Sequence, residues 1–300
     1  MIEDLLPRCR FPQPGTPVTC AVSGGADSLA LLVLATAARC TVTAVHVDHG
    51  LRPGSAGEAG VVRAAAERFG AGFRAEQVHV RPGPNLEARL RAARYAVLPP
   101  DVLTGHTADD QAETLLLNLL RGSGRSGLAA MRPDGHPLLA LRRSETHALC
   151  ESLGLEPVVD PTNTDPRLRR NRVRHELMPL ADTIAQRDVA GLLARTASLL
   201  HDDELLLEEL SRAIDPTDAR ALSAAARPLA ARALRRWLAP HLGGYVPDHD
   251  AIERVLGVAR GSAASCDVCG GVRVHRRLQR LHIVRTGAGV DSDPPVGPTR

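Results

Sequence analysis

Short apolar runs alternate with amphipathic segments over the first half of the chain. Runs rich in β-branched residues predict buried strands at about 18–22, 41–47, 73–78 and 102–105. Apolar residues at helical spacing predict helices between them, at about 28–38, 55–69 and 85–98. Strands that alternate with helices are typical of a parallel, doubly wound α/β sheet. We also expect a last strand at 138–141 and a short helix at 144–153.

Beyond Pro179 the pattern changes to segments rich in Ala, Leu and Arg. Their periodicity predicts helices at about 184–213, 228–239 and 248–258. Two β-branched runs, at 271–276 and 281–285, predict a hairpin. We therefore expect an α/β domain over 1–180, a smaller and mainly helical domain over 181–286, and a disordered Pro/Gly/Asp-rich tail over 287–300.

Length and composition agree with this division and narrow the class of protein. The chain has 300 residues, more than the ~100 to 200 of a typical domain. Its content of 44% hydrophobic and 24% charged residues is ordinary for a soluble globular protein. No run approaches the ~18 apolar residues of a membrane span, and the N-terminus lacks the pattern of a signal peptide. We expect a cytoplasmic protein without a membrane partner, whose net charge of +3 is too small to establish a nucleic-acid partner.

The six cysteines are scattered along the chain, and a cytoplasmic setting keeps them reduced. Most are expected to be small core residues. Cys266 and Cys269 match one half of a CxxC metal site, but no second CxxC accompanies them. The role of this pair stays open.

A glycine-rich turn, Ser23-Gly24-Gly25-Ala26-Asp27-Ser28, links the first strand to the first helix. Adjacent glycines allow a close approach to a ligand, and serines with the N–H groups of a helix start can bind an anion. An ordinary turn capped by serine explains these residues equally well. Asp27 favours a nucleotide, since a carboxylate beside phosphate requires a cation such as Mg²⁺ between them. The chain has no lysine, which excludes the common GxxxxGK[ST] loop.

Polar residues follow two further strands, where open parallel sheets bind ligands. His46, Asp48 and His49 end the second strand, and they either shape a loop or bind a ligand. His106 follows the fourth strand and precedes a helix start that carries several acids. Acids in a first helical turn suit the helix dipole. Asp110 and Glu113 also share one helical face, where they could hold a metal or an amine.

Two arginine-rich segments have two interpretations each. The helix at 85–98 carries Glu87, Arg91, Arg94 and Tyr95 on one face. Glu87 and Arg91 could form a solvated salt pair, or the arginines of this face could bind ATP or RNA. Residues 167–174 hold five arginines and no acid, which suits either a solvated face or phosphate contacts. Glycines and basic residues between Arg121 and Asp134 suggest a mobile loop that closes over the site or touches RNA.

Together these motifs resemble the tRNA(Ile)-lysidine synthases, bacterial PP-loop enzymes that modify the wobble cytidine of an isoleucine tRNA. The matching segments are Ser23–Ser28, His46–Arg52, Glu87–Tyr95, Gly105–Thr114 with Arg121–Gly124, and Asp160–Pro179. The last segment is the most diagnostic for this family. The resemblance covers about 17–180, and the helical tail matches only in general character.

The resemblance implies an ATP-dependent ligase. ATP adenylates the carbonyl oxygen on carbon 2 of the cytidine in a CAU anticodon, pyrophosphate leaves, and the amine of free L-lysine displaces AMP. The loop residues would bind ATP: Ser23, Gly24, Gly25, Ala26, Asp27 and Ser28. Asp27 would act in catalysis and hold Mg²⁺, with His106 and Arg94 near the developing charge. Asp110 and Glu113 would receive the lysine ammonium. Phosphates of the tRNA would meet Arg169, Arg170, Arg172 and Arg174.

Two positions depart from the family pattern. Thr107 stands where the family has a second histidine, and His136 stands where the family often has arginine. The nearest alternative is a tRNA cytidine thiolase, but its cysteine pair for an iron–sulfur cluster is missing between Ser23 and Pro179. A non-catalytic nucleotide- or tRNA-binding module would need neither Asp110 nor Glu113. The sequence leaves the oligomeric state open, a homodimer included, as well as the tRNA identity elements and the order of substrate binding.

Overall fold

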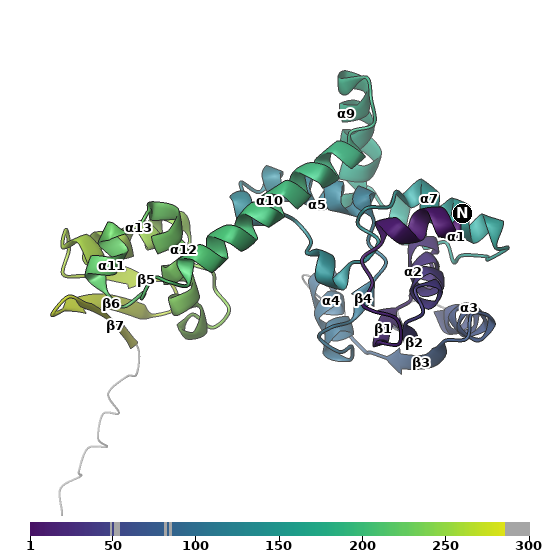
Figure 1. Ribbon diagram of the computed structural model, residues 1–300, viewed down its shortest axis with the longest axis horizontal. Coiled ribbons are helices and arrows are strands. Elements are labelled where there is room, and N and C mark those ends of the chain that lie inside the picture. The colour runs from purple at the N-terminus through teal and green to yellow at the C-terminus, as the bar shows by residue number, and fades with distance from the viewer. Residues whose placement is uncertain (49, 51–54, 81–82, 84–85, 286–300) are drawn as a thin grey trace, which may run out of the picture. The chain divides into compact units, whose positions relative to one another are not determined.

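The computed structural model describes residues 1–48, 50, 55–80, 83 and 86–285 (Figure 1). It divides into two compact units, Met1–His201 and Asp202–Arg300. Several expectations fall on residues outside the described ranges: those on His49 and Arg52, the start of the predicted helix at residue 85, and the tail from 287 onward. No helix in the described part of the chain is long and apolar enough to cross a membrane.

A parallel sheet forms the centre of the first unit. Its strands are β1 (Pro17–Ala21), β2 (Thr41–Asp48), β3 (Gly72–Gln77) and β4 (Leu103–Thr104). They lie in the order β3-β2-β1-β4, and every neighbouring pair is parallel. The predicted fold class is therefore confirmed. Because the strands are parallel, their carboxyl ends meet at one edge of the sheet.

Helices cover both faces of this sheet. They are α2 (Ala26–Ala37), α3 (Ser55–Arg68), α4 (Leu86–Ala96) and α7 (Arg143–Ser152). Figure 1 shows α2 and α3 on one side of the strands and α4 on the other. Successive side chains of β2 point to opposite faces of the sheet. Val42 and Ala44 pack in the core formed with α2, α3 and α7, whereas Val45 packs on the other face with Leu98, which follows α4.

The predicted strand at 138–141 is wrong. These residues form turns, in which Leu138 and Leu141 are fully buried in the main core. The Leu141 carbonyl accepts the N–H of Ala108 at the start of α5 (Ala108–Leu120), at 2.8 Å, instead of a strand neighbour. Two short helical turns precede residues 138–141, α6 (Arg125–Leu128) and a 3₁₀ turn (Pro133–Gly135).

The predicted helix at 184–213 begins later than expected. A separate helix, α9 (Met178–Ala185), ends at Gln186 in the left-handed conformation, and α10 (Ala190–Ser211) follows. Val189 and Ala190 pack with Ala112 of α5 in a core of the first unit. This packing explains why the first unit extends past residue 180. Between α7 and α9 lie a 3₁₀ turn (Pro161–Thr164), α8 (Arg169–Arg172) and a π-helical turn (Val173–Leu177).

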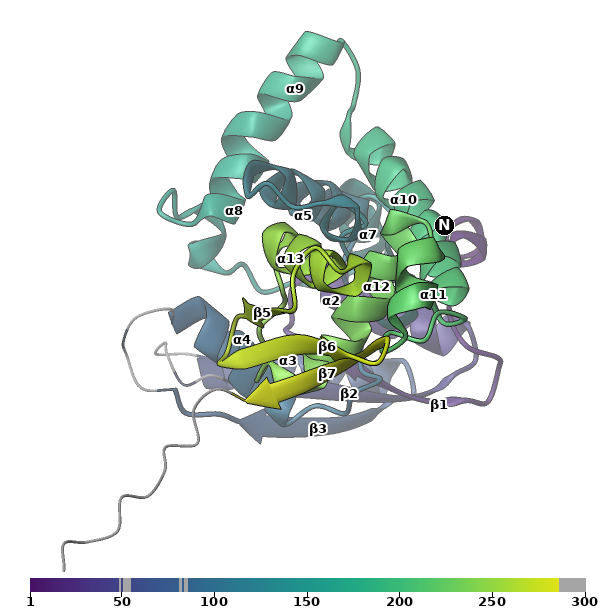
Figure 2. The same ribbon diagram turned by 90° about the vertical axis from the view of Figure 1, so that its left-hand side faces the viewer.

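The second unit packs three helices on a small sheet. The helices are α11 (Ala219–Ala224), α12 (Arg227–Leu238) and α13 (His249–Arg260). The antiparallel strands β5 (Ser265–Val268), β6 (Val272–Arg277) and β7 (Arg280–Arg285) lie in that order. The predicted hairpin is confirmed as β6 and β7, seen side by side in Figure 2, while β5 was not expected.

Candidate active site

The glycine-rich turn is held by its own serines. Ser28 Oγ accepts the N–H of Ser23 at 3.1 Å and donates to the Gly25 carbonyl at 2.8 Å. Gly24 has a φ of +90°, and a Cβ there would lie 3.0 Å from Val158 Cγ2. Val158 also donates its N–H to the Gly24 carbonyl at 3.0 Å. Glycine is therefore required at position 24 by backbone conformation and by the segment that covers it.

Asp27 lies in the first turn of α2, directly after this loop. Its carboxylate accepts a hydrogen bond from Thr146 and lies 3.6 Å from Arg143 Nε, both on α7. Burial raises the pKa of Asp27 above its ordinary value, and Asp110 adds to this shift. A Cβ at Gly105, after β4, would lie 2.4 Å from the Asp27 carbonyl oxygen. Gly105 thus allows the start of α2 to pack against the end of β4.

Two buried nitrogens near the carboxyl edge have no hydrogen-bond partner among the described residues. One is Nε2 of His46 on β2, a side chain only 2% exposed whose Nδ1 lies 3.0 Å from the Val22 carbonyl. The other is Nε of Arg94 on α4. Buried polar atoms rarely stay unsatisfied. A nucleotide supplies hydroxyl, ring-nitrogen and phosphate groups that suit both, so the chemistry of this edge fits ATP.

The start of α5 fixes Asp110 and Glu113. Asp110 Oδ2 accepts the backbone N–H of Thr107 at 2.9 Å, so this carboxylate caps the helix. Its Oδ1 accepts hydrogen bonds from Arg143 at 2.9 Å and from Arg170 at 3.0 Å. Although burial raises the pKa of Asp110, Arg143 and Arg170 lower it to about 2.

Glu113 lies at the centre of the same cluster and is 1% exposed. Its carboxylate accepts hydrogen bonds from Arg174 at 2.7 Å, Arg170 at 2.8 Å and Arg143 at 3.2 Å. Three arginines therefore face three carboxylates, those of Asp27, Asp110 and Glu113. Opposite charges this close neutralise one another at a buried site, where a lone charge would be costly.

His106 and Arg94 lie beside this cluster. His106 Nδ1 is 2.7 Å from Thr104 Oγ1, and its ring lies 4.9 Å from that of His136. Burial lowers the pKa of His106 to about 3, with Arg94 among the charges that lower it further. His106 is therefore a neutral imidazole at pH 7. Arg94 and Arg91 both lie over the ring of Tyr95, at 5.6 and 5.0 Å from its centre.

A cavity of about 160 Å³ opens beside Glu113. It is lined by acids from two segments, Asp109 and Glu113 of α5 and Asp182 and Asp188 around the turn between α9 and α10. Arginines line it too, Arg142, Arg143 and Arg174. A cavity with both signs of charge suits a small zwitterion such as an amino acid.

Most residues predicted for the site come together, but the arginines at 167–174 separate. Arg170 and Arg174 point to Glu113, as described above. Arg172 instead pairs with Glu176 at 2.8 Å on an exposed surface. Arg169 is exposed as well. The run therefore contributes two arginines to the cluster and leaves three at the surface, Arg167, Arg169 and Arg172.

Sequence reasoning missed Arg142 and Arg143. Asp109 explains their position: it accepts the backbone N–H of Arg143 at 2.7 Å and pairs with Arg142 at 2.9 Å. A signal was present, because arginines at a helix start oppose the helix dipole. Two arginines directly before the helix predicted at 144–153 therefore indicate acidic partners elsewhere in the fold.

Asp27 is the residue that suits Mg²⁺ in this site. Mg²⁺ is usually held by one or two carboxylates together with phosphate oxygens and water. No group of three potential metal-binding side chains exists within the described ranges. The donor set therefore fits a metal shared with a bound phosphate better than a metal held by protein alone.

Known proteins share the sequence family and the fold of this chain. A family model described as a PP-loop domain matches residues 5–181. The fold and the loop at Ser23–Ser28 thus define a PP-loop protein. A tRNA(Ile)-lysidine synthase of Nocardia farcinica is 46% identical over 247 residues, which cover 76% of this chain and 77% of that protein. Its counterpart in Mycobacterium tuberculosis (strain H37Rv) is 39% identical over 285 residues, covering 88% and 86%. The chain belongs to the tRNA(Ile)-lysidine synthase family.

A solved structure of a U34-tRNA thiolase from Methanococcus maripaludis also has this fold. The match has a TM-score of 0.53 at 17% identity and covers 67% of this chain and 78% of that one. At this identity the likeness supports the fold alone.

Proposed function

We propose that this protein ligates free L-lysine to carbon 2 of the wobble cytidine of tRNA(Ile) with a CAU anticodon. ATP first adenylates the cytidine and releases pyrophosphate, and the lysine amine then displaces AMP. Family membership supports this activity. The observation that carries it is the position of Arg143, which contacts Asp27 of the ATP loop and both Asp110 and Glu113.

The loop after β1 would hold the phosphates. The backbone of Gly24, Gly25 and Ala26 and the hydroxyls of Ser23 and Ser28 offer hydrogen bonds at the carboxyl edge of the sheet. Asp27 would hold Mg²⁺, whose chemistry is to neutralise charge on the leaving pyrophosphate. Arg94, whose Nε lacks a partner in the described structure, would meet a further oxygen of the reacting groups.

Charge balance suggests how one cluster serves two substrates. Without substrate, three arginines satisfy Asp27, Asp110 and Glu113. A triphosphate offers these arginines stronger anionic partners. Asp110 and Glu113 would then be free to accept the ammonium of lysine, a compact cation. The cavity of about 160 Å³ beside Glu113 would take the remainder of the amino acid.

Arg169 and Arg172 are exposed and would contact tRNA phosphates. Contact of Arg170 and Arg174 with RNA requires that their guanidiniums leave Glu113. The second unit, with α11 to α13, would bind further tRNA phosphates. We place the reaction in the cytoplasm, because ATP, free lysine and tRNA are all available there.

The test is incorporation of lysine into RNA. Purified protein is incubated with ATP, Mg²⁺, labelled L-lysine and transcripts of tRNA(Ile) that carry CAU or an altered anticodon. We expect label in the CAU transcript only. One AMP and one pyrophosphate should be released for each lysine incorporated. Release of ADP, or no label in RNA, would contradict the proposal. A thiolase would instead transfer sulfur, and a binding module would hold ATP and tRNA without AMP release. Sedimentation of the purified protein decides between a monomer and the homodimer.

A further inference from the structure

A second and larger cavity lies on the other side of the first turn of α5. Its volume is about 380 Å³, and it belongs wholly to the first unit. From α5 it is lined by Ala108 and Gln111, whereas Asp109 and Glu113 line the acid-rich cavity described above. At helical spacing these two pairs project from different sides of one helix. One helical turn therefore separates two cavities.

The lining of the larger cavity is basic. It contains four arginines and two histidines and no acidic residue among its described lining: Arg8, Arg10, Arg142, Arg195, His136 and His201. Its other walls are largely apolar, with Met131, Pro133, Pro137 and Leu139. An apolar cavity with basic side chains suits a ligand that is both anionic and partly flat or apolar.

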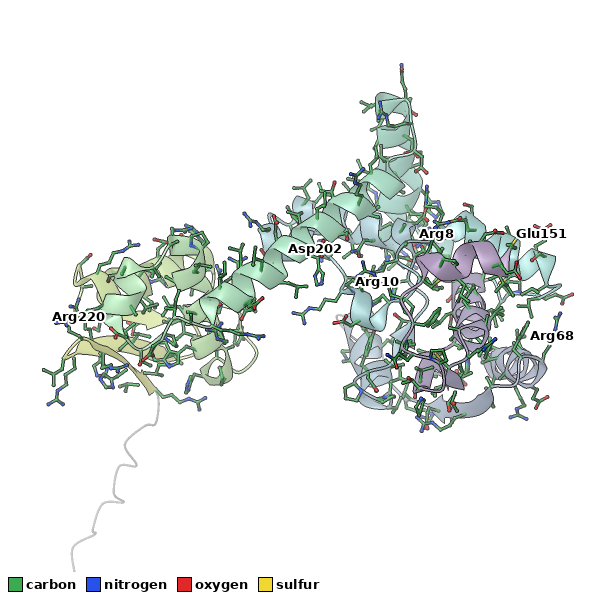
Figure 3. All side chains as sticks on the ribbon, in the orientation of Figure 1. Arg8, Arg10, Arg68, Glu151, Asp202 and Arg220 are labelled. Carbon is green, nitrogen blue, oxygen red and sulfur yellow. The ribbon has the colours of Figure 1, made fainter. Side chains whose placement is uncertain are left out.

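Two of the four arginines already have partners. Arg8 pairs with Glu145 at 2.5 Å, and Arg142 pairs with Asp109 and Asp188. The guanidiniums of Arg10 and Arg195 make no ion pair or hydrogen bond with any residue that the structure describes. Arg10 follows α1 (Ile2–Leu5) and a 3₁₀ turn (Leu6–Arg8) at the N-terminus (Figure 3), and Arg195 lies on α10. Two cations from distant segments thus converge on one cavity, and no acid of the described residues pairs with either.

The cavity adjoins the candidate active site through one of its lining residues. His136 lines it, and the ring of His136 lies 4.9 Å from that of His106. Gln111 fixes the wall between them, because its side chain exchanges two hydrogen bonds with the backbone of Met131, at 2.9 and 3.1 Å. A ligand here would therefore lie next to His106.

We propose that this cavity binds the RNA strand next to the nucleotide being modified. Phosphodiester oxygens would contact Arg10 and Arg195, and an unstacked base or ribose would lie on the apolar wall. The acid-rich cavity would then take the cationic substrate and the basic cavity the anionic one, on opposite sides of α5. This inference rests on the proposed function for the identity of the ligand.

The experiment uses the full chain and charge-removing variants, Arg10→Gln, Arg195→Gln and the double variant. The matched control is Arg39→Gln, an exposed arginine before β2, at the opposite edge of the sheet. Binding of fluorescent tRNA(Ile) is measured by anisotropy between ~50 and ~200 mM salt, a range over which a protein with about six to ten phosphate contacts loses ~10³-fold or more in affinity. For two single-stranded phosphate contacts we expect the slope of log Kd against log salt to fall by ~1.4 in the double variant. The control should keep the slope of the unaltered protein.

Kinetics provide the second readout. We expect the KM for tRNA to rise roughly tenfold per lost contact, since ~1.4 kcal/mol per contact is a factor of ten. The KM for ATP and for lysine should stay unchanged. Arg10→Lys with Arg195→Lys keeps both charges and should restore most of the salt slope, and circular dichroism shows whether each variant is folded.

The outcomes separate the two proposals. If the unaltered protein incorporates lysine but the folded double variant keeps its salt slope and its KM for tRNA, the cavity does not bind RNA and the inference is wrong. If the double variant changes the KM for ATP alone, the cavity binds a small anion instead, which also overturns it. If the unaltered protein incorporates no lysine, the proposed function fails, and the salt slope still tests RNA binding by the cavity.

Discussion

Arg143 Nε lies 3.6 Å from the carboxylate of Asp27, and the same guanidinium donates to Asp110 at 2.9 Å. One side chain from the start of α7 thus joins the loop after β1 to the start of α5. Although burial lowers the pKa of Arg143, the surrounding carboxylates raise it above its usual range. Arg143 stays charged, so any anion or cation that enters this region must exchange partners with it.

Removal of Arg143 should destabilise the protein. We expect Arg143→Met to lower the free energy of unfolding by ~3 kcal/mol, the low end for breaking a buried pair, because Arg170 and Arg174 still face the carboxylates. Urea denaturation at pH 7 measures this. Arg167→Met is the control, because Arg167 is 87% exposed and, among the described residues, pairs only with Asp165. Equal stability of the two variants would show that the buried contacts of Arg143 contribute nothing.

Replacement of Gly24 should weaken ATP binding more than it weakens the fold. Gly24 and Gly15 both have positive φ, +90° and +84°, so alanine strains either position by ~1 to 2 kcal/mol. A Cβ at Gly24 also meets Val158, whereas nothing lies within 4 Å of a Cβ at Gly15. We expect Gly24→Ala to lose more stability than Gly15→Ala because of this added contact with Val158, and only Gly24→Ala to raise the KM for ATP, by roughly tenfold. A normal KM for ATP in Gly24→Ala would contradict the role of this turn.

The parts of the fold that sequence predicted correctly depend on local patterns. Strand and helix periodicity fixed the parallel sheet, and the spacing of Asp110 and Glu113 placed both carboxylates on one side of α5. The loop Ser23–Ser28 is likewise contiguous. Each signal lies within a few residues, so no knowledge of the tertiary structure was needed to interpret it.

The features that sequence missed depend on contacts between distant segments. Leucines at 138–141 look the same in a buried turn as in a strand, because apolar periodicity over four residues does not distinguish them. The break between α9 and α10 was readable in principle, since Asp188 Oδ1 accepts the N–H of Ala190 at 3.0 Å as a helix cap. The partners of Arg143 were not readable, because Asp27 and Asp110 are far from it in sequence.

Neutralising the acids of α5 should affect lysine more than ATP. We expect Asp110→Asn and Glu113→Gln to raise the KM for lysine at least tenfold, about 1.4 kcal/mol, because each removes a carboxylate from the ammonium site. Lysine-dependent AMP release at saturating ATP and tRNA measures this. Glu151→Gln, at the exposed end of α7 (Figure 3), is the control. Unchanged lysine dependence in both variants would reject these residues as the lysine site.

The stability of the protein in acid should depend on Asp110. Its pKa falls from an ordinary 3.8 to about 2 in the folded protein. A carboxyl with a lowered pKa stabilises the fold above its unfolded pKa, and the contribution disappears as the pH falls through the folded pKa. We therefore expect the stability difference between the unaltered protein and Asp110→Asn to shrink by ~2 kcal/mol between pH 5 and pH 2. A difference that is constant across this range would contradict the lowered pKa.

His106 should stay neutral throughout the physiological range. Burial lowers its pKa to about 3, whereas a free imidazole titrates near ~6.5. We expect the ¹⁵N shifts of His106, assigned with His106→Gln, to stay constant between pH 5 and 8 while those of free histidine change. Between these two pKa values the unfolded chain binds a proton at His106 and the folded protein does not. Neutral His106 therefore contributes its full stability above about pH 6.5, and this contribution is lost as the pH falls toward 3. Titration of His106 near neutrality would show instead that the site can carry an additional positive charge. The three arginines and three carboxylates alone would then not account for the charge of the site.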